Sequence, residues 1–511
     1  MLTHLALAME DTRQDFDNLI WDKNDEQWEK VQPELRQRST IRLVEALATE
    51  KFERPSTWIT PMKIGGYNII YRLRVEGLSS DIIVRRPISC YAQFPEEKTL
   101  IEAATASYIE KHTRIPTASV LFHGSTAELG NYLIIKYIKH QYSMSTALNA
   151  TNNDTDKPFV LDPNIPEDFL QDLYRKVASC LLELSQHTFP RIGSLVESSQ
   201  GSYSVASRPI TRNMNDMLQL AGIPRLILPP RDKTYSTADE YYTALADMHL
   251  AQLVFQHNDL VTSADDCRNK YVARHIFRRL AREGKLSTFG FKDDSWSTNS
   301  QTTRTVSSPA PPNAGSFRLY CDDLRAGNIL LDASPNVAAV IDWEFTYAAP
   351  SQFSLDPPWW LVLEAPDMWE AGIEDWIAFY EPRMEIWLSA VRKAEDEAAA
   401  EGKERCVEVL LSTYMRESWE TGRFWLSYAA RKSWAFDTLF WKFLDERFFG
   451  VRRNRVSGDG LWKTRLHLLS EAEKNAMEPF VARKMEEIKE RKLVEWGPED
   501  TKRRLAEVVF D

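Results

Sequence analysis

The chain of 511 residues is 43% hydrophobic and 27% charged, a composition typical of a globular protein long enough for two or three lobes. Its net charge of −11 argues against a general nucleic-acid-binding protein, because phosphate binding needs clustered positive charge. The five cysteines include no CxxC pair, which indicates a reduced, cytoplasmic chain. We expect no signal peptide and no membrane partner, since no apolar run reaches membrane-spanning length.

The first part of the chain predicts a helical extension followed by a β-rich lobe. Residues 1–54 look helical and polar with scattered apolar anchors. From Thr57 the apolar residues alternate with polar ones, and this pattern predicts a small nucleotide-binding lobe over residues 55–140. Gly65 and Gly66 lie between the first two predicted strands, where backbone N–H groups can approach phosphates closely. An ordinary hairpin turn is the alternative use of the two glycines.

Two charged residues of this lobe are candidates for the phosphate side of a nucleotide site. Arg85 ends the third predicted strand, and Glu102 lies on a predicted helix over residues 97–113, from which it would hold Arg85 toward a nucleotide. A solvent-facing arginine and a solvated helix carboxylate are the alternatives. The segment after the fifth predicted strand, from Lys136 to Ile138, would be the hinge whose backbone meets an adenine ring.

The remainder of the chain is predicted to be mainly helical. Residues 141–450 form the expected large catalytic lobe, with an inserted helical block at 200–285, and residues 451–511 form a charged helical extension. The Ser/Thr/Pro-rich segment 284–316 predicts a flexible surface loop, or a lid over the site. The tetrapeptide HNDL at 257–260 imitates a catalytic HxDL motif but lacks the later Asn, so we expect a loop or a helix cap there.

The stretch FRLYCDDLRAGNILLDASPNVAAVIDWEFTYA, from Phe317 to Ala348, has the clearest chemistry. Its apolar runs are separated by turn residues and predict an antiparallel hairpin, with Asn328 before the first strand and Asp342 after the second. Both side chains then fall at the open end of the hairpin, close enough to share one ion, and Asp323 faces the same spot. An Asp, four residues, an Asn and a hairpin that ends in Asp form the constellation of kinase-like phosphoryl transfer.

Three residues of this stretch have a role in such chemistry and also a plainer alternative. Asp323 would be the catalytic base that accepts the proton of a substrate hydroxyl, while Asn328 and Asp342 would supply the oxygen ligands that Mg2+ prefers. A loop cap, a turn residue and a helix N-cap are the respective alternatives. We favour the catalytic assignment because the three residues occur together, at this spacing and around a readable hairpin.

The sequences CDDLRAGNILLD and AVIDWEF resemble the catalytic core of the aminoglycoside phosphotransferase and choline-kinase-like superfamily, in which HxDLxxxN precedes IDWE or IDFE. Further similar pieces, among them GGYNIIYRL, IIVRRP and SRPITRNMN, extend the resemblance over most of residues 55–450, and it is similar to the large fungal branch of the family. The resemblance implies a two-lobed α+β, protein-kinase-like fold with helical insertions and extensions. It also implies ATP and Mg2+ as cofactors and phosphoryl transfer to the hydroxyl of a small molecule.

The sequence departs from the family pattern beside the expected base. Cys321 stands where the family usually has His, Asp322 where it usually has Gly or Asn, and Arg85 where the third strand usually has Lys. Glu344 would support the metal site, or be a surface or structural carboxylate. A nucleotide-binding pseudokinase or scaffold, a protein kinase and another use of ATP such as adenylylation therefore stay as alternatives. The sequence names neither the acceptor nor the oligomeric state.

Overall fold

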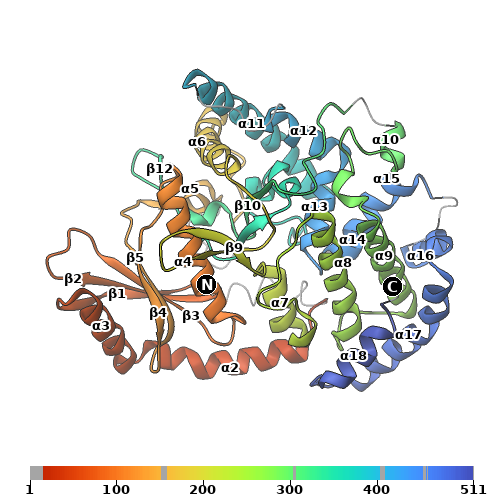
Figure 1. Ribbon diagram of the computed structural model, residues 1–511, viewed down its shortest axis with the longest axis horizontal. Helices are drawn as coiled ribbons and strands as arrows, with labels where there is room; N and C mark the ends of the chain where they lie inside the picture. The colour runs from red at the N-terminus through yellow and green to blue at the C-terminus, as the bar shows by residue number, and fades with distance from the viewer. Residues whose placement is uncertain are drawn as a thin grey trace.

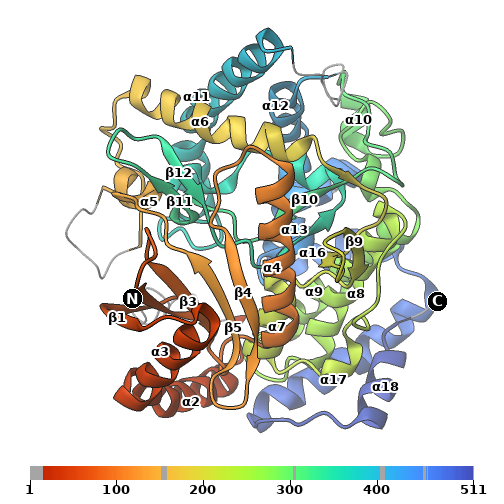
Figure 2. The same ribbon diagram turned by 60° about the vertical axis from the view of Figure 1, so that its left-hand side comes forward.

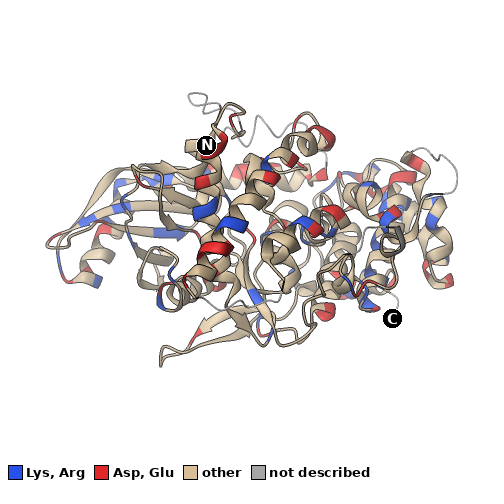
Figure 3. Cartoon of the chain, turned by 90° about the horizontal axis from the view of Figure 1, so that it is seen from above, with Lys and Arg blue, Asp and Glu red and all other residues tan. Residues whose placement is uncertain are grey.

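The computed structural model describes residues 15–150, 158–302, 306–402, 409–452, 456 and 458–509. The chain forms two lobes of unequal size, a small one built around an antiparallel sheet and a large, mainly helical one (Figure 1). The fold is therefore the two-lobed α+β arrangement that the sequence predicts. Every helix among the described residues is too short or too polar to span a bilayer. In the view of Figure 3, basic and acidic residues are interspersed over both lobes.

The small lobe is a five-stranded antiparallel sheet in the order β1-β2-β3-β5-β4. Its strands are β1 (Ser56–Ile64), β2 (Asn68–Val75), β3 (Ile82–Pro87), β4 (Val120–Thr126) and β5 (Gly130–Lys136). The register of β1 on β2 shifts between Ile59 and Lys63, around Pro61, which has no backbone N–H to donate. The pairings of β3 with β2 and with β5 have no register shift, so they define which face of the sheet each side chain of β3 points to.

Two helices pack on opposite faces of this sheet. Helix α3 (Arg38–Phe52) covers the face that contains Tyr71. Arg85 is paired with Ile70, the neighbour of Tyr71, so it points to the other face, where α4 (Pro95–His112) lies. Figure 2 shows α4 upright between the sheet and the large lobe, so that its residues can contact both.

The strands of the large lobe form small sheets among its helices, ordered β13-β10-β7, β12-β11-β6 and β8-β9 in the described part of the chain. These strands are β6 (Tyr142–Ser143), β7 (Thr188–Phe189), β8 (Ser194–Glu197), β9 (Tyr203–Ser207), β10 (Phe317–Cys321), β11 (Ile329–Leu331), β12 (Val337–Val340) and β13 (Thr346–Ala349). The helices after α4 are α5 (Met144–Leu148), α6 (Glu167–Ser185), α7 (Arg212–Ala221), α8 (Ala238–Phe255), α9 (Ala264–Arg282), α10 (Thr298–Thr302), α11 (Ile373–Ala400), α12 (Leu411–Thr421), α13 (Arg423–Arg431), α14 (Phe436–Leu439), α15 (Asp445–Phe449), α16 (Leu461–Arg465), α17 (Glu471–Glu490) and α18 (Pro498–Ala506).

The N-terminal helix α2 (Asn18–Arg36) contacts both lobes (Figure 1). At its start, Asp17 caps the helix and its N–H donates to the Leu220 carbonyl of the large lobe over 3.0 Å. Further along, the ring of Trp28 packs on Tyr91 of the small lobe, with centroids 5.3 Å apart. The helix therefore links the two lobes outside the hinge.

The HNDL tetrapeptide connects two distant segments of the chain through hydrogen bonds. Asn258 donates to the Asp17 carboxylate over 2.9 Å, and Asp259 accepts from Arg491 over 2.8 Å. Asp259 has a φ of 65°, a left-handed conformation that Asp tolerates better than bulky residues do. The tetrapeptide thus holds the start of α2 and the segment after α17 together, in agreement with the expectation of a loop.

The segment 284–316 differs from the expected flexible surface loop in its described residues. Phe289 is fully buried, and the Ser297 hydroxyl donates to Asp294 over 2.6 Å within the large lobe. Asn299 donates to the carbonyl of Thr421 at the end of α12 over 3.0 Å. The prediction failed because it weighed the Ser and Pro content, whereas the aromatic residues between them supply apolar area to bury.

Candidate active site

The stretch from Phe317 to Ala348 forms the hairpin that the sequence predicts. Strands β11 and β12 are antiparallel, and Ile329 pairs with Val340 at their open end. One step further, the N–H of Ile341 donates to the Asn328 carbonyl over 2.9 Å. Asn328 and Asp342 therefore leave the hairpin side by side, and Asp342 turns away from it with a φ of 66°.

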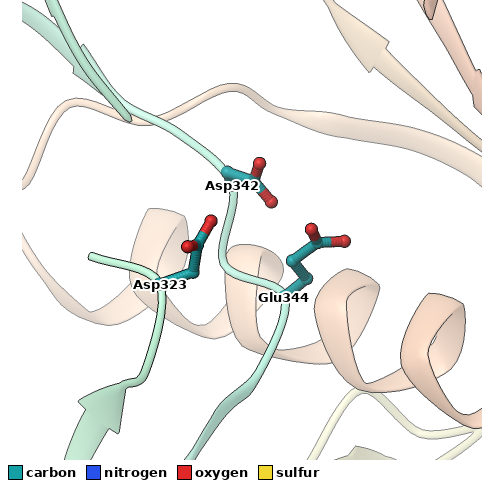
Figure 4. A group of neighbouring side chains, drawn as sticks. All are labelled: Asp323, Asp342 and Glu344. Atoms are coloured by element: carbon teal, nitrogen blue, oxygen red, sulfur yellow. The ribbon is translucent and has the colours of Figure 1, made fainter. Parts of the chain in front are cut away.

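Three carboxylates converge at this end of the hairpin (Figure 4). One oxygen from each of Asp323, Asp342 and Glu344 lies within 4.8 Å of the other two. Asp323 belongs to the loop after β10, and the others belong to the loop before β13. Because β10 and β13 are paired, with Cys321 opposite Thr346, the two loops leave the sheet at the same place.

Asn328 contacts Asp323 directly. Its side-chain amide donates to the Asp323 carbonyl over 2.7 Å and to the Asp323 carboxylate over 3.2 Å. Both side chains are buried. Since the amide nitrogen is used in this way, the amide oxygen is the ligand atom that Asn328 offers to an ion.

The thiol of Cys321 supports the loop that contains Asp342. Its sulfur lies 3.5 Å from the Glu344 carbonyl and 3.8 Å from the Asp342 carbonyl, within reach of weak S–H hydrogen bonds. Burial raises the pKa of Cys321 well above its ordinary value, so the thiol keeps the proton that it donates. Cys321 thus holds this backbone from the position where the related family usually has His.

Arg85 is the centre of a buried ion-pair cluster. Its guanidinium pairs with Glu102 of α4, with Asp342 at 2.6 Å and with Glu344 at 2.8 Å. The Arg85 and Glu102 side chains are each 7% exposed. The alternatives of a solvent-facing arginine and a solvated helix carboxylate are therefore excluded by the geometry.

Lys98 is a second buried cation, and the sequence analysis above assigns it no role. It pairs with Glu344 and donates to the side-chain oxygen of Asn68 over 2.9 Å. Asn68 in turn donates to Glu344 over 2.8 Å, which makes Glu344 a buried partner of cations and not a surface carboxylate. The spacing of Lys98 and Glu102, four residues apart on one helix, was the signal that could have found it.

The balance of charge in this cluster sets the ionisation of its carboxylates. Burial by itself raises the pKa of Glu344, but Arg85 and Lys98 overcome this effect and hold it below its ordinary value. Burial raises the pKa of Asp342 to about 8, since Arg85 is shared with Glu344 and Glu102, whose negative charges add to the shift. A divalent cation beside Asp342 would return it to the charged form.

The glycine turn between β1 and β2 is docked onto the large lobe. Within the turn, the N–H of Gly65 donates to the Asn68 carbonyl over 2.8 Å. The hydroxyl of Tyr67 donates to Asp216 of α7 over 2.9 Å. A side chain added at Gly66 would meet none of the described atoms within 4 Å, so this turn leaves open space for a ligand.

The predicted hinge lies at the junction of the lobes, after β5. The N–H groups of Lys136 and Tyr137 donate to the carbonyls of Ser119 and Asp81, over 2.9 and 3.0 Å. These donors are thus used inside the small lobe. The carbonyl of Ile138 lies 2.8 Å from Nδ1 of His140. Contacts of Lys136 and Ile138 with a nucleotide stay a prediction.

Two further cations lie beside Asp323. The Nη1 atom of Arg212, at the start of α7, is 3.7 Å from Asp323 Oδ1, and the Nε atom of Arg325 is 3.5 Å from the same oxygen. Asp216 holds Arg212 from the other side, at 3.5 Å. Arg212 has no role in the sequence-based prediction, because the inserted block lies far along the chain from the stretch between Phe317 and Ala348, although SRPITRNMN belongs to the resemblance.

The residues at the end of the hairpin fit Mg2+. Their donor atoms are carboxylate and amide oxygens, the ligands that this ion prefers. Asp342 and the amide oxygen of Asn328 are the groups that would hold it, with Asp323 facing the same space. Glu344 is committed to Lys98, so it serves better as a partner that balances charge than as a ligand.

No family model and no curated protein matches the sequence. Solved structures that match include a macrolide 2'-phosphotransferase type I, at 13% identity and a TM-score of 0.38, over 81% of this chain and 96% of that chain. They also include a putative aminoglycoside phosphotransferase from Ralstonia eutropha, at 11% identity and a TM-score of 0.38, over 88% and 98% of the two chains. A third is the aminoglycoside phosphotransferase APH(4)-Ia, at 16% identity and a TM-score of 0.37, over 78% and 98%.

At such low identity and TM-score, the likeness says nothing about the activity of this chain, which has to be argued from the site itself. In structure, the chain is similar to aminoglycoside and macrolide phosphotransferases, the family whose catalytic core its sequence resembles.

Proposed function

We propose that the chain is an ATP- and Mg2+-dependent phosphotransferase that phosphorylates a hydroxyl group of a small molecule. The observation that supports this most is the convergence of Asp323, Asn328 and Asp342 at the end of one hairpin, with Arg85 paired to Asp342. Phosphoryl transfer asks little covalent chemistry of the protein. It needs a metal site, a cation on the phosphates and a group that orients the attacking hydroxyl, and this set offers all of them.

Asp323 is the proposed catalytic base. Asn328 donates to one of its carboxylate oxygens, and Arg325 and Arg212 lie beside the other, so that its position is defined from both sides. The acceptor hydroxyl oxygen would form a bond to the γ-phosphorus while its proton passes to Asp323. The bond from that phosphorus to the leaving oxygen breaks at the same time, and ADP departs with the electron pair.

Arg85 is the proposed cation on the phosphates. Its guanidinium keeps one nitrogen on Glu102 and directs the other to Asp342. A planar guanidinium can contact a phosphate oxygen without giving up its carboxylate partner. A Mg2+ ion held by Asp342 and Asn328 would neutralise the charge that develops on the phosphoryl oxygens.

The inserted block supports a small acceptor. It places α7 directly beside Asp323, with Arg212 as the contact and Tyr67 of the glycine turn bound to the same helix through Asp216. A polypeptide substrate would have to pass this helix to bring a side-chain hydroxyl to Asp323. A small molecule meets no such obstacle, so a protein kinase is the less favoured alternative.

The variant Asp323→Asn tests the proposal, because it preserves the shape of the side chain and removes the base. We expect ADP release with an active acceptor to fall about 100- to 10,000-fold, while ATP still binds. The measurement is a coupled ADP-release assay over a library of hydroxylated metabolites, with the exposed Asp232→Asn as the control that behaves like the unaltered chain. If ATP binds and no acceptor gives more turnover than Asp323→Asn does, the pseudokinase or scaffold alternative replaces the proposal.

A further inference from the structure

One group of charged residues near Asp323 has hydrogen-bond donors that the proposed transfer does not use. Arg212 lies between Asp323 and Asp216. Lys432 directly follows α13, and the N–H of its neighbour Ser433 donates to the side-chain oxygen of Asn213, the neighbour of Arg212, over 3.0 Å, so the two cations come from adjoining segments. The Arg212 side chain is 38% exposed, and Lys432 is partly exposed, so solutes can reach both. The two cations come from distant parts of the sequence, and the contact between Ser433 and Asn213 brings their segments together.

The acidic side chains around Lys432 already have hydrogen-bond or ion-pair partners of their own. Those whose charge acts on it are Asp367, Asp322 and Asp216. Each has a partner within hydrogen-bond or ion-pair distance: Asp216 has Arg212 and the Tyr67 hydroxyl, Asp322 has Arg431 at 3.6 Å, and Asp367 has the Tyr428 hydroxyl at 2.5 Å. Glu364 also lies near Arg212, and burial raises its pKa to about 7, which halves its negative charge near neutral pH.

Lys432 has no such partner. Its backbone N–H donates to the Ala429 carbonyl, but its ammonium group makes no hydrogen bond and no ion pair with any residue that the structure describes. Burial, together with the nearby charge of Arg212, lowers its pKa. A partly enclosed ammonium group without an acceptor costs free energy, and a bound anion would remove that cost.

The guanidinium of Arg212 also has N–H groups that can bind a ligand. Its Nη1 atom lies 3.7 Å from Asp323, beyond the length of a hydrogen bond, so this contact leaves the N–H groups free to turn to a ligand. Its fork-shaped guanidinium matches the paired oxygens of a carboxylate or a phosphate. Asp216 and Tyr67 hold the side chain beside the base while it does so.

We propose that Arg212 and Lys432 form an anion site on the acceptor side of Asp323, and that the acceptor is a hydroxylated anion whose carboxylate or phosphate group binds there. The inference rests on the proposed function and narrows it, since it names the class of acceptor. A neutral polyol would leave Lys432 unmatched, and a cationic acceptor would be repelled by Lys432 and Arg212 together.

The test uses compounds that share a three-carbon diol and differ in one end group: glycerol 3-phosphate, glycerate, glycerol and 3-amino-1,2-propanediol. Each is titrated calorimetrically into the full chain with Mg2+ and a non-hydrolysable ATP analogue. We expect one or both anions to bind tighter than glycerol by about tenfold or more, the effect of one charge-assisted hydrogen bond. The stronger of the two anions tells whether the site takes a phosphate or a carboxylate.

Variants of Lys432 complete the test. Lys432→Met should remove the preference for the anions, Lys432→Arg should retain it, and the exposed Lys489→Met is the matched control. Thermal unfolding of each variant checks that it is folded. The proposal is overturned if glycerol or the amine binds as tightly as the anions, if no anion binds, or if the preference survives in Lys432→Met.

Binding of the ATP analogue distinguishes a failure of the proposed anion site from a failure of the proposed phosphotransferase. If Lys432→Met weakens binding of the ATP analogue by about tenfold or more, Lys432 contacts the nucleotide phosphates, and the proposed acceptor site is overturned. If the unaltered chain binds no ATP analogue, the proposed phosphotransferase fails, whatever the anions do. Anion preference with intact nucleotide binding supports both.

Discussion

Cys321 shows at the scale of one residue how the catalytic loop is held without a histidine. Its thiol donates to the backbone carbonyls of Asp342 and Glu344, and its raised pKa keeps it protonated for that task. A buried thiol of this kind is a poor nucleophile, because only the thiolate reacts readily. Cys321 therefore has a positioning role in this site.

Alkylation tests that role. At about pH 8, iodoacetamide should leave Cys321 unmodified in the native chain and modify it completely in concentrated urea, as peptide mass spectrometry can show. Rapid labelling of Cys321 in the native chain would contradict the account, since it would mean that the thiol is accessible and ionised.

Lys98 stabilises the negative charge of Glu344 in the buried cluster. Lys98→Met should destabilise the chain by about 3–5 kcal/mol near neutral pH, because it takes one partner from a buried carboxylate. The folded-state pKa of Glu344 is lowered, so its contribution to stability is present above its unfolded-state pKa and is lost as the pH falls through the folded one. The loss in Lys98→Met should therefore shrink as the pH falls from about 7 to below 4.5, the ordinary pKa of a glutamate.

Urea unfolding of Lys98→Met and of the surface variant Lys489→Met, across this pH range, provides the measurement. Lys489 is exposed, and its removal should change the free energy of unfolding little at any pH. A destabilisation in Lys98→Met that is the same at both ends of the range would show that Glu344 does not depend on the charge of Lys98.

At the scale of elements, the glycine turn is fixed to α7 by Tyr67. The hydrogen bond from its hydroxyl to Asp216 joins the phosphate side of the site to the helix that brings Arg212 to the acceptor side. The contact therefore fixes the glycine turn of the small lobe to a helix of the large lobe.

Tyr67→Phe removes the hydroxyl that contacts both Asp216 and Arg212. We expect backbone amides of residues 64–68 to exchange hydrogen faster, in line with a lost hydrogen bond of about 0.5–1.5 kcal/mol. Hydrogen-exchange mass spectrometry measures it, with Tyr142→Phe, a change in a large-lobe strand, as the control. Unchanged exchange in the turn would show that the turn is held by other contacts.

The hairpin and its polar ends could be predicted from the sequence, because short-range signals define them: apolar runs, an Asn/Pro turn and a fixed spacing from Asn328 to Asp342. Arg212 could not be placed beside Asp323, nor Lys432 near the start of α7, since their positions depend on how α7 and α13 pack in three dimensions. The segment 284–316 was misjudged because composition reports polarity and says nothing of where its aromatic residues pack.

On the scale of the whole molecule, the site is divided between the lobes. Arg85 and the glycine turn belong to the small lobe, while Asp323 and Asp342 belong to the large one. Helix α2 links the lobes through contacts at both of its ends, and Asn258 of the HNDL tetrapeptide holds its first turn. A nucleotide with Mg2+ would join the same two lobes from inside the site.

The most direct test of the account is therefore the Mg2+ dependence of nucleotide binding. Titration calorimetry of an ATP analogue should show that the unaltered chain and Asp232→Asn bind tighter by about tenfold or more when Mg2+ is present. Asp342→Asn should bind with the same weak affinity in either condition, because it lacks the proposed ligand. If Mg2+ strengthens binding to Asp342→Asn as much as to the unaltered chain, the metal site is not at Asp342 and the central claim is wrong.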